Sequence, residues 1–290
     1  MFKFKLDLTG RIVSSSLAIL LVACTVSLVT LGIRGVRPEL KQASTKDDPS
    51  SSSAVLKKSP DFGAYYLNSI VYLGDTTISH MSSDGALSEG EEAKQIWSGA
   101  DGSLPLAKGI EKSGIILPQS GTEIGITDAL DKIKPDYLLI TLGAENGARY
   151  CTEEQFKSYY TDLIIAVKEA SPGTKIILNS IFPISRKYEF NTQGISADKI
   201  DKANAWIVEI AEEQGVKYLD SASALKNSHG YLDKKYDSGD GLHLSAEGYS
   251  VFFDHIRNHG YVNNVHDEIQ PTETGTESEE ITSEESSEES

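Results

Sequence analysis

The stretch Ile70-Val71-Tyr72-Leu73-Gly74-Asp75-Thr76-Thr77 decides how the rest of this chain is organised. Its first four residues are apolar and mostly β-branched or aromatic, which is typical of a strand buried on both faces of a parallel sheet. Gly74-Asp75 then predicts a sharp turn, because glycine tolerates backbone angles that other residues avoid. Open α/β sheets bind ligands at the carboxyl ends of their strands. The hydroxyl of Thr76 is therefore placed to act as a nucleophile if a base can reach it.

Apolar runs and helical patterns alternate between residues 61 and 262. Strands are predicted at 115–117, 136–142, 174–181 and 216–219, and helices at 123–133, 152–170, 197–214 and 245–259. This alternation predicts a single α/β domain whose parallel sheet is covered by helices on both faces. Residues 61–262 are thus expected to form the folded unit.

An uncharged apolar stretch of 22 residues, 12–33, follows a short basic segment, 1–11. It is long enough to cross a bilayer as one helix. We therefore predict a signal anchor at 12–33 that holds the protein in the cell membrane, with 1–11 in the cytoplasm and the larger part outside the cell. A second interpretation stays open, because Leu21-Val22-Ala23-Cys24 resembles a lipoprotein cleavage box that would leave a lipid on Cys24. The apolar residues that continue beyond Cys24 favour the anchor.

Two polar segments flank the predicted domain. Residues 34–60 include Ser50-Ser51-Ser52-Ser53 and are predicted to be a flexible linker. Residues 263–290 carry ten carboxylates from Asp267 onward and are predicted to be a disordered acidic tail. These ten account for most of the net charge of -16, so the rest of the chain is only mildly acidic. No basic stripe is present to neutralise phosphates, which argues against a nucleic-acid partner.

His243, in Gly239-Asp240-Gly241-Leu242-His243, offers a base for the Thr76 hydroxyl. Asp240 lies three residues earlier, so one turn of a loop can bring its carboxylate to the imidazole. A hydroxyl, an imidazole and a carboxylate in a row form the arrangement that activates a nucleophile. On spacing alone, a surface loop whose polar residues cap a helix is the simpler interpretation, and both stay open at this point.

Three segments, taken in order, resemble the SGNH (GDSL-type) hydrolases. They are Gly74-Asp75-Thr76 after the first strand, Gly143-Ala144-Glu145-Asn146 after a central strand, and Asp240-x-x-His243 before the last helix. The resemblance covers about residues 66–262. The stretches 72–75, 94–97 and 239–243 are similar to those of membrane-anchored members from Gram-positive bacteria. The resemblance implies a flavodoxin-like three-layer α/β/α sandwich with a parallel sheet, and an esterase or acyltransferase mechanism.

The resemblance also implies a role for each matching residue. Thr76 takes the place of the nucleophile, His243 that of the general base, and Asp240 that of the residue that orients the base. The Thr76 backbone N–H, Gly121 and an asparagine after the central strand would donate hydrogen bonds to the oxyanion. No cofactor or metal is implied. The expected partners are a small ester or acylated surface glycan as substrate, and the cytoplasmic membrane through the N-terminal helix.

Three positions depart from the family pattern. The family carries serine where this chain has Thr76, whose extra methyl restricts χ1. The family asparagine falls on Glu145, whose carboxylate would repel an oxyanion, or on Asn146 after a slip of one residue. His80 stands where many members have glycine. Three interpretations therefore remain: a hydrolase with a threonine nucleophile, a catalytically degenerate surface binding module, or an unrelated use of His80 and Glu145 with Asp75, such as metal binding.

Two further segments carry weaker signals. Cys151 is a conceivable nucleophile, but a lone cysteine at a helix start is more often a packing residue, and a disulfide with Cys24 is not expected. The glycine-rich segment after Trp97, residues 98–102, offers a wall for a substrate groove, because loops near sites carry specificity. A solvent-covered turn is the simpler interpretation of that segment.

Overall fold

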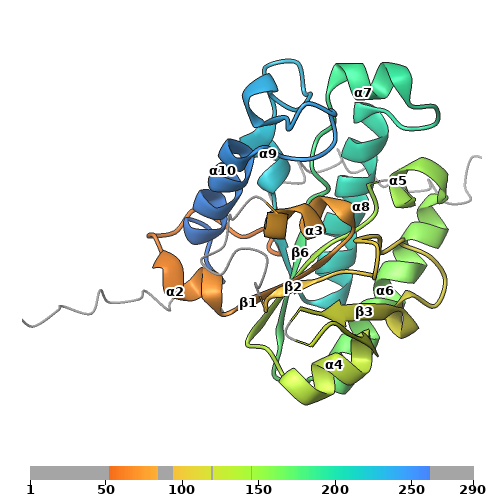
Figure 1. The fold of residues 1–290 in the computed structure, drawn as a ribbon, viewed down its shortest axis with the longest axis vertical. Coiled ribbons are helices and arrows are strands. Elements are labelled where there is room, and N and C mark those ends of the chain that lie inside the picture. The colour runs from red at the N-terminus through yellow and green to blue at the C-terminus, as the bar shows by residue number, and fades with distance from the viewer. Residues whose placement is uncertain (1–51, 84–93, 119, 145, 262–290) are drawn as a thin grey trace, which may run out of the picture. The chain divides into compact units, whose positions relative to one another are not determined.

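The computed structural model describes residues 52–83, 94–118, 120–144 and 146–261 (Figure 1). All of them except Ser52 belong to one compact unit that begins at Ser53. The predicted signal anchor, the predicted acidic tail, most of the predicted linker, and Glu145 lie outside the described residues. Within the described ranges, no helix is both long enough and apolar enough to cross a membrane.

Five parallel strands form the central sheet, in the order β2-β1-β5-β6-β7. The strands are β1 (Ile70–Gly74), β2 (Ile96–Trp97), β5 (Tyr137–Thr141), β6 (Lys175–Asn179) and β7 (Lys217–Leu219). Strand β1 is buried along its whole length and pairs with β5 from Ile70 opposite Tyr137 to Gly74 opposite Thr141. Counted within the sheet, the order is 2-1-3-4-5, the doubly wound order of flavodoxin. The predicted α/β fold with a parallel sheet is confirmed.

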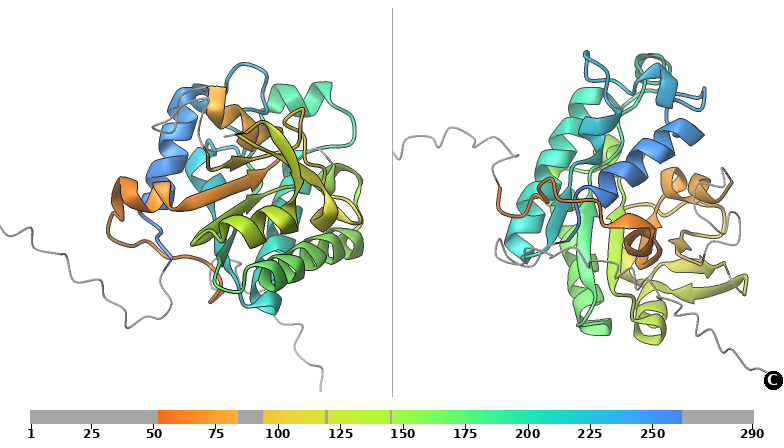
Figure 2. Two further views of the ribbon diagram at one scale, coloured as in Figure 1. Left: turned by 60° about the horizontal axis from the view of Figure 1, so that its bottom comes forward. Right: turned by 90° about the vertical axis from the view of Figure 1, so that its left-hand side faces the viewer.

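Helices cover both faces of the sheet. One face carries α4 (Ile126–Ile133), α6 (Glu153–Ala170) and α8 (Ala197–Gln214), and the other carries α2 (Gly63–Asn68), α3 (Thr76–Ser83) and α10 (Ala246–Arg257). Successive strand residues face opposite sides, so Val71 packs with the first group and Tyr72 with the second. Figure 2 shows α8 and α10 on opposite sides of the strands in its right-hand view.

Shorter elements connect these layers. They are α5 (Gly147–Tyr150), α7 (Arg186–Asn191), α9 (Ser221–Leu225) and the 3-10 turns η3 (Ile110–Lys112) and η4 (Lys234–Tyr236). Several lie in the connections that leave the carboxyl ends of the strands. The fold therefore concentrates irregular chain at that edge of the sheet, where α/β proteins place their ligand sites.

An antiparallel hairpin takes the place of one predicted strand of the sheet. Strand β3 (Gly114–Leu117) pairs with β4 (Thr122–Gly125) in a separate two-stranded sheet, and the helix predicted from residue 123 begins only at Ile126. The strand that follows β1 in the main sheet is β2 instead. Its two residues, Ile96 and Trp97, are too few to produce a periodic signal in the sequence.

The folded unit begins earlier than the linker prediction places it. Val55 forms a parallel bridge with Tyr218 of β7, and the Leu56 N–H donates a hydrogen bond of 2.8 Å to the Tyr218 carbonyl. Ala54 and Leu56 are buried. This segment covers the outer edge of β7, so the part of the predicted linker from Ala54 onward belongs to the fold.

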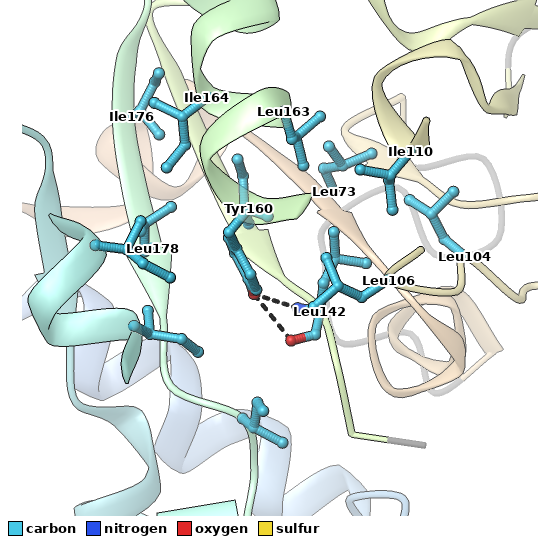
Figure 3. Close-up of a cluster of buried hydrophobic side chains, with 14 of the residues drawn as sticks. Leu73, Leu104, Leu106, Ile110, Leu142, Tyr160, Leu163, Ile164, Ile176 and Leu178 are labelled. Carbon is cyan, nitrogen blue, oxygen red and sulfur yellow. Dashed lines mark hydrogen bonds between the residues drawn. The ribbon is translucent and has the colours of Figure 1, made fainter. Parts of the chain in front are cut away.

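A buried tyrosine fixes the chain at the carboxyl end of β5 (Figure 3). The Tyr160 hydroxyl donates to the Leu142 carbonyl at 2.9 Å and accepts from the Leu142 N–H at 3.2 Å. Leu142 directly follows β5, where the strand ladder no longer satisfies its backbone groups. Burial raises the pKa of the Tyr160 hydroxyl well above its usual range, so the group remains a donor. The tyrosine thus anchors the start of the loop that contains Gly143 and Asn146.

Replacing Tyr160 by phenylalanine is expected to lower the free energy of unfolding by about 1–3 kcal/mol, because both backbone groups of Leu142 lose their buried partner. Urea denaturation of the two proteins measures the difference. Tyr159→Phe is the matched control, since the Tyr159 hydroxyl has no hydrogen-bond partner in the described part of the chain. Equal losses in the two variants would contradict the assigned role.

Candidate active site

Strand β1 leads into α3 through a turn with no room for a side chain. A Cβ added to Gly74 would lie 2.7 Å from the Thr141 carbonyl oxygen. Asp75 then caps the helix, because its Oδ1 accepts hydrogen bonds from the Thr77 N–H at 3.2 Å and the Thr77 hydroxyl at 2.8 Å. Thr76 is the first residue of α3, and N–H groups in a first helical turn have no partner within their helix. The Thr76 N–H is therefore available to a ligand at this edge of the sheet.

Asp240 and His243 lie together on a tightly hydrogen-bonded loop before α10. Asp240 Oδ2 lies 2.5 Å from His243 Nδ1, and Asp240 Oδ1 accepts from the backbone N–H groups of Leu242 and His243 at 2.9 Å each. Leu242 and Leu244, on either side of His243, are buried and anchor the loop. The imidazole therefore turns Nδ1 to the carboxylate and leaves Nε2 for a different partner.

The electrostatics of the Asp240 carboxylate follow from these contacts. Partial burial acts to raise its pKa, but the hydrogen bonds from the His243 ring and from the backbone of His243 and Leu242 outweigh this and lower the pKa to about 2. Asp240 is thus negatively charged at any pH near neutrality. A fixed negative charge beside Nδ1 stabilises an imidazolium when Nε2 takes up a proton.

His80 joins the Thr76 segment to the His243 loop. It stands one turn after Thr76, on the same side of α3, and its ring stacks on the ring of His243 with 3.8 Å between centroids and 13° between planes. A second link lies deeper, where the buried Tyr249 of α10 donates a hydrogen bond of 2.8 Å to the Thr77 carbonyl. Helix α3 and the His243 loop therefore meet at the same edge of the sheet.

The two atoms expected to react are both enclosed and unpartnered. Thr76 Oγ1 and His243 Nε2 are inaccessible to solvent, and neither has a hydrogen-bond partner among the described residues, so they do not bond to each other. Leaving a buried polar atom unpaired costs about 1–3 kcal/mol. Catalytic hydrogen bonds are often long without substrate and tighten when it binds. Two such atoms at the junction of α3 and the His243 loop are typical of a functional site.

Asn146 lies beside a small cavity near the start of α3. The cavity is lined by Asp75, Gly143, Asn146 and the segment 103–106. Asn146 precedes α5 but its side chain makes no capping hydrogen bond, and among the described residues its amide has no other hydrogen-bond partner, so it can donate to a ligand. The structure thus brings Asn146 close to the Thr76 segment. This position suits the alternative in which the family asparagine corresponds to Asn146 and not to Glu145. Glu145 lies outside the described residues.

Gly121 is not part of this group. It is exposed in the turn between β3 and β4. Ile116 forms an antiparallel bridge with Ser98, so the chain from Ile116 to Gly121 runs back toward the amino end of β2, away from the site. The assignment of Gly121 depended on treating 115–117 as the second strand of the sheet, and the topology corrects this.

The residues that follow the second strand are 98–102, the glycine-rich segment noted in the sequence. Trp97 itself is fully buried. A Cβ added to Gly102 would lie 2.6 Å from the Ser79 hydroxyl oxygen, so this segment packs directly on α3. Only the position of β2 in the sheet reveals that the segment borders the site, since its sequence resembles any polar turn.

The remaining candidates have other environments. Burial raises the pKa of the Cys151 thiol, which disfavours the reactive thiolate. Asp75, one of the three residues in the hypothetical metal site, serves as the cap of α3. In the part of the chain that the structure describes, no three or more His, Cys, Asp or Glu residues are grouped so as to hold a metal ion.

The sequence of this chain matches the GDSL-like Lipase/Acylhydrolase family over residues 106–251. The match spans just over half of the 290 residues and includes Asn146, Asp240 and His243. The chain belongs to this family. The segment that contains Thr76 lies before the matched range.

Several solved structures are similar to this chain, at low identity. The periplasmic domain of a lipopolysaccharide acetyltransferase from Salmonella ser. Paratyphi A is 15% identical, with 70% of this chain and 84% of that chain covered and a TM-score of 0.45. A carbohydrate esterase family 3 protein from Talaromyces cellulolyticus is 17% identical, with 65% and 93% covered and a TM-score of 0.41. A GDSL-like lipase from Bacteroides thetaiotaomicron is 14% identical, with 63% and 83% covered and a TM-score of 0.43. Comparison with curated proteins gives no match.

The low pKa of Asp240 predicts a pH dependence of stability. A carboxyl whose pKa is lowered by folding stabilises the folded state above its unfolded pKa, about 3.9, and this contribution is lost as the pH falls toward 2. Asp240→Asn is therefore expected to be less stable than the parent at pH 5–7, and the difference should vanish near pH 2. Thermal or urea unfolding at several pH values measures it.

The control is Asp131→Asn, which removes an exposed carboxylate paired with Lys134 at 3.6 Å. Exposed pairs of this kind contribute little to stability. A stability difference between Asp240→Asn and the parent that persists unchanged down to pH 2 would contradict the assigned contacts of Asp240.

Proposed function

We propose that this protein is a carboxylic ester hydrolase that removes small acyl groups from esters or acylated surface glycans. Thr76 is the nucleophile, His243 the general base, and Asp240 the residue that orients the base. The observation that carries the proposal is that Thr76 Oγ1 and His243 Nε2 are both enclosed and have no partner in the described part of the chain, while the Asp240 carboxylate lies 2.5 Å from His243 Nδ1. This is the arrangement that generates a nucleophilic hydroxyl.

The first half of the reaction transfers the acyl group to the enzyme. Thr76 Oγ1 attacks the ester carbonyl carbon, its proton passes to His243 Nε2, and the carbonyl oxygen becomes an oxyanion. The Thr76 backbone N–H and the Asn146 side-chain amide donate hydrogen bonds to that oxygen. The bond to the leaving alcohol then breaks, and the alcohol takes the proton from His243. Asp240 remains a carboxylate and stabilises the transient imidazolium.

The second half releases the acyl group as an acid. A water molecule gives a proton to His243 Nε2 and attacks the acyl carbon attached to Thr76. The second oxyanion forms at the same donors. When the bond to Thr76 Oγ1 breaks, the proton on His243 returns to that oxygen, and the carboxylic acid leaves. Every proton is thus exchanged through one imidazole nitrogen.

Thr76 is expected to make ester hydrolysis slower than a serine at the same position would. Its β-carbon carries a methyl group next to the attacking oxygen, and this branching restricts χ1. Serine at the same position would reach the carbonyl with more rotational freedom. We therefore place this protein among slower hydrolases of small acyl groups. Its location at the outer face of the cell membrane, through the apolar stretch 12–33, is part of the same proposal.

A series of variants at Thr76 tests the reaction directly. With p-nitrophenyl acetate as substrate, the full chain is expected to be active, Thr76→Ala to lose at least about 10³-fold in kcat/KM, and Thr76→Ser to equal or exceed the parent. Steady-state release of p-nitrophenol measures all three. Thr122→Ala is the control, since Thr122 is an exposed residue of the β3–β4 hairpin.

Two outcomes would count against the proposal. If parent, Ala and Ser variants are all inactive while folded, the site binds acylated ligands without turnover, as a degenerate family member would. If Thr76→Ala is as active as the parent, a different residue is the nucleophile.

A further inference from the structure

The contact between His80 and His243 is the least expected feature of the site. The two imidazoles are nearly parallel and 3.8 Å apart between centroids, so one face of the His243 ring is covered by the other ring. His80 is itself exposed, whereas the His243 side chain is only 13% exposed. His80 therefore forms part of the wall that encloses His243 on the solvent side.

The hydrogen bond to Asp240 does not by itself determine where His243 Nε2 points. The 2.5 Å contact fixes one ring atom, Nδ1. The ring is also bonded to Cβ through Cγ, but rotation about this bond is soft in histidine. Such a rotation changes the direction of Nε2 as long as the carboxylate can follow Nδ1. A flat neighbour packed against the ring face removes this freedom. The carboxylate and the His80 ring together thus determine the direction of Nε2.

His80 is attached to the same rigid element as the nucleophile. Thr76 and His80 are one turn apart on α3, whose start is capped by Asp75 and whose Thr77 carbonyl accepts a hydrogen bond from Tyr249. Any displacement of α3 moves the hydroxyl and the aligning ring together. Because His80 contacts His243, the His243 ring is held in place relative to Thr76. An aligning ring on another element would not move together with Thr76.

The restricted side chain of Thr76 explains why the direction of His243 Nε2 matters. A threonine hydroxyl cannot adjust to its base as freely as a serine hydroxyl, because χ1 of a β-branched side chain is restricted. The base must then be aimed at the hydroxyl. Misplacement of a reacting group by 1 Å costs about 10²-fold in rate. Thr76 and His80 are also two of the three departures of this chain from its family pattern, four residues apart on one helix.

We propose that His80 is a positioning residue whose flat ring, stacked on His243, holds His243 Nε2 in line with the Thr76 hydroxyl. This inference rests on the proposed hydrolase function. The role requires an aromatic ring at position 80, and it requires neither a proton nor a charge from His80.

Kinetics of three variants of the full chain test the proposal. His80→Ala and His80→Gln remove the ring, the second while keeping a polar side chain, and both are expected to lower kcat on p-nitrophenyl acetate about 10- to 100-fold with KM changed less than about threefold. His80→Phe keeps a flat ring and is expected to restore kcat to within about threefold of the parent. His229→Ala, which removes an exposed histidine from the loop between α9 and η4, should have no effect.

Two kinetic results would overturn the proposal. If His80→Ala keeps or raises kcat, His80 obstructs the site and does not align it. If His80→Phe is as slow as His80→Ala while both melt at the temperature of the parent, the polar atoms of His80 matter and its ring does not.

A spectroscopic measurement separates this inference from the proposed function. In protein labelled with ¹⁵N-histidine, the proton between His243 Nδ1 and Asp240 is expected to give a strongly deshielded, sharp resonance in the parent and in His80→Phe. The resonance should broaden or disappear in His80→Ala, because the ring is free to tilt.

This readout needs no turnover. A resonance that depends on the ring at position 80 in a protein without esterase activity would uphold the positioning role while the proposed function fails. A resonance that is the same in the parent, His80→Phe and His80→Ala would overturn the positioning role whatever the activity.

Discussion

The close approach of Gly74 to the Thr141 carbonyl oxygen is the constraint on which the site depends. Since no side chain fits there, β1 can end and α3 can begin with only Asp75 between them. Thr76 consequently starts the helix at the carboxyl edge of the sheet, and its N–H has no partner among the described residues. A bulkier residue in place of Gly74 would push the strand from its neighbour and displace the nucleophile together with the helix that carries it.

The second half of the site is fixed by burial and hydrogen bonding far along the chain. Leu242 and Leu244 hold the loop in the core, Asp240 ties its backbone, and Tyr249 connects α10 to the carbonyl of Thr77. These contacts keep two polar atoms, Thr76 Oγ1 and His243 Nε2, enclosed and without partners among the described residues, at a cost of about 1–3 kcal/mol each. Two such atoms at one place are typical of a functional site, and under the proposed function they are kept for the ester group and its oxyanion.

Features set by neighbouring residues could be predicted from the sequence, and features set by distant contacts could not. The buried run of β1, the parallel sheet and the short spacing of Asp240 and His243 follow from local patterns. Strand β2 has only two residues and is defined by its pairing with β1. The sequence therefore predicted 115–117 as the second strand of the sheet, and Gly121 after it as the oxyanion donor. The pairing of Val55 with Tyr218 joins segments far apart in the chain, so the sequence did not show that residues from Ala54 onward belong to the fold. The stack of His80 on His243 is of the same kind, since spacing along α3 indicates only that His80 shares a side with Thr76.

Covalent labelling tests the central claim, that Thr76 and His243 form one reacting pair, most directly. A fluorophosphonate reacts with an activated hydroxyl by forming an oxygen–phosphorus bond and releasing fluoride, and peptide mass spectrometry locates the adduct. We expect an adduct on Thr76 in the parent protein and none on Thr76 in folded His243→Ala, because the unactivated hydroxyl is a poor nucleophile. An adduct on another residue, or equal labelling of Thr76 in both proteins, would mean that Thr76 and His243 do not form such a pair.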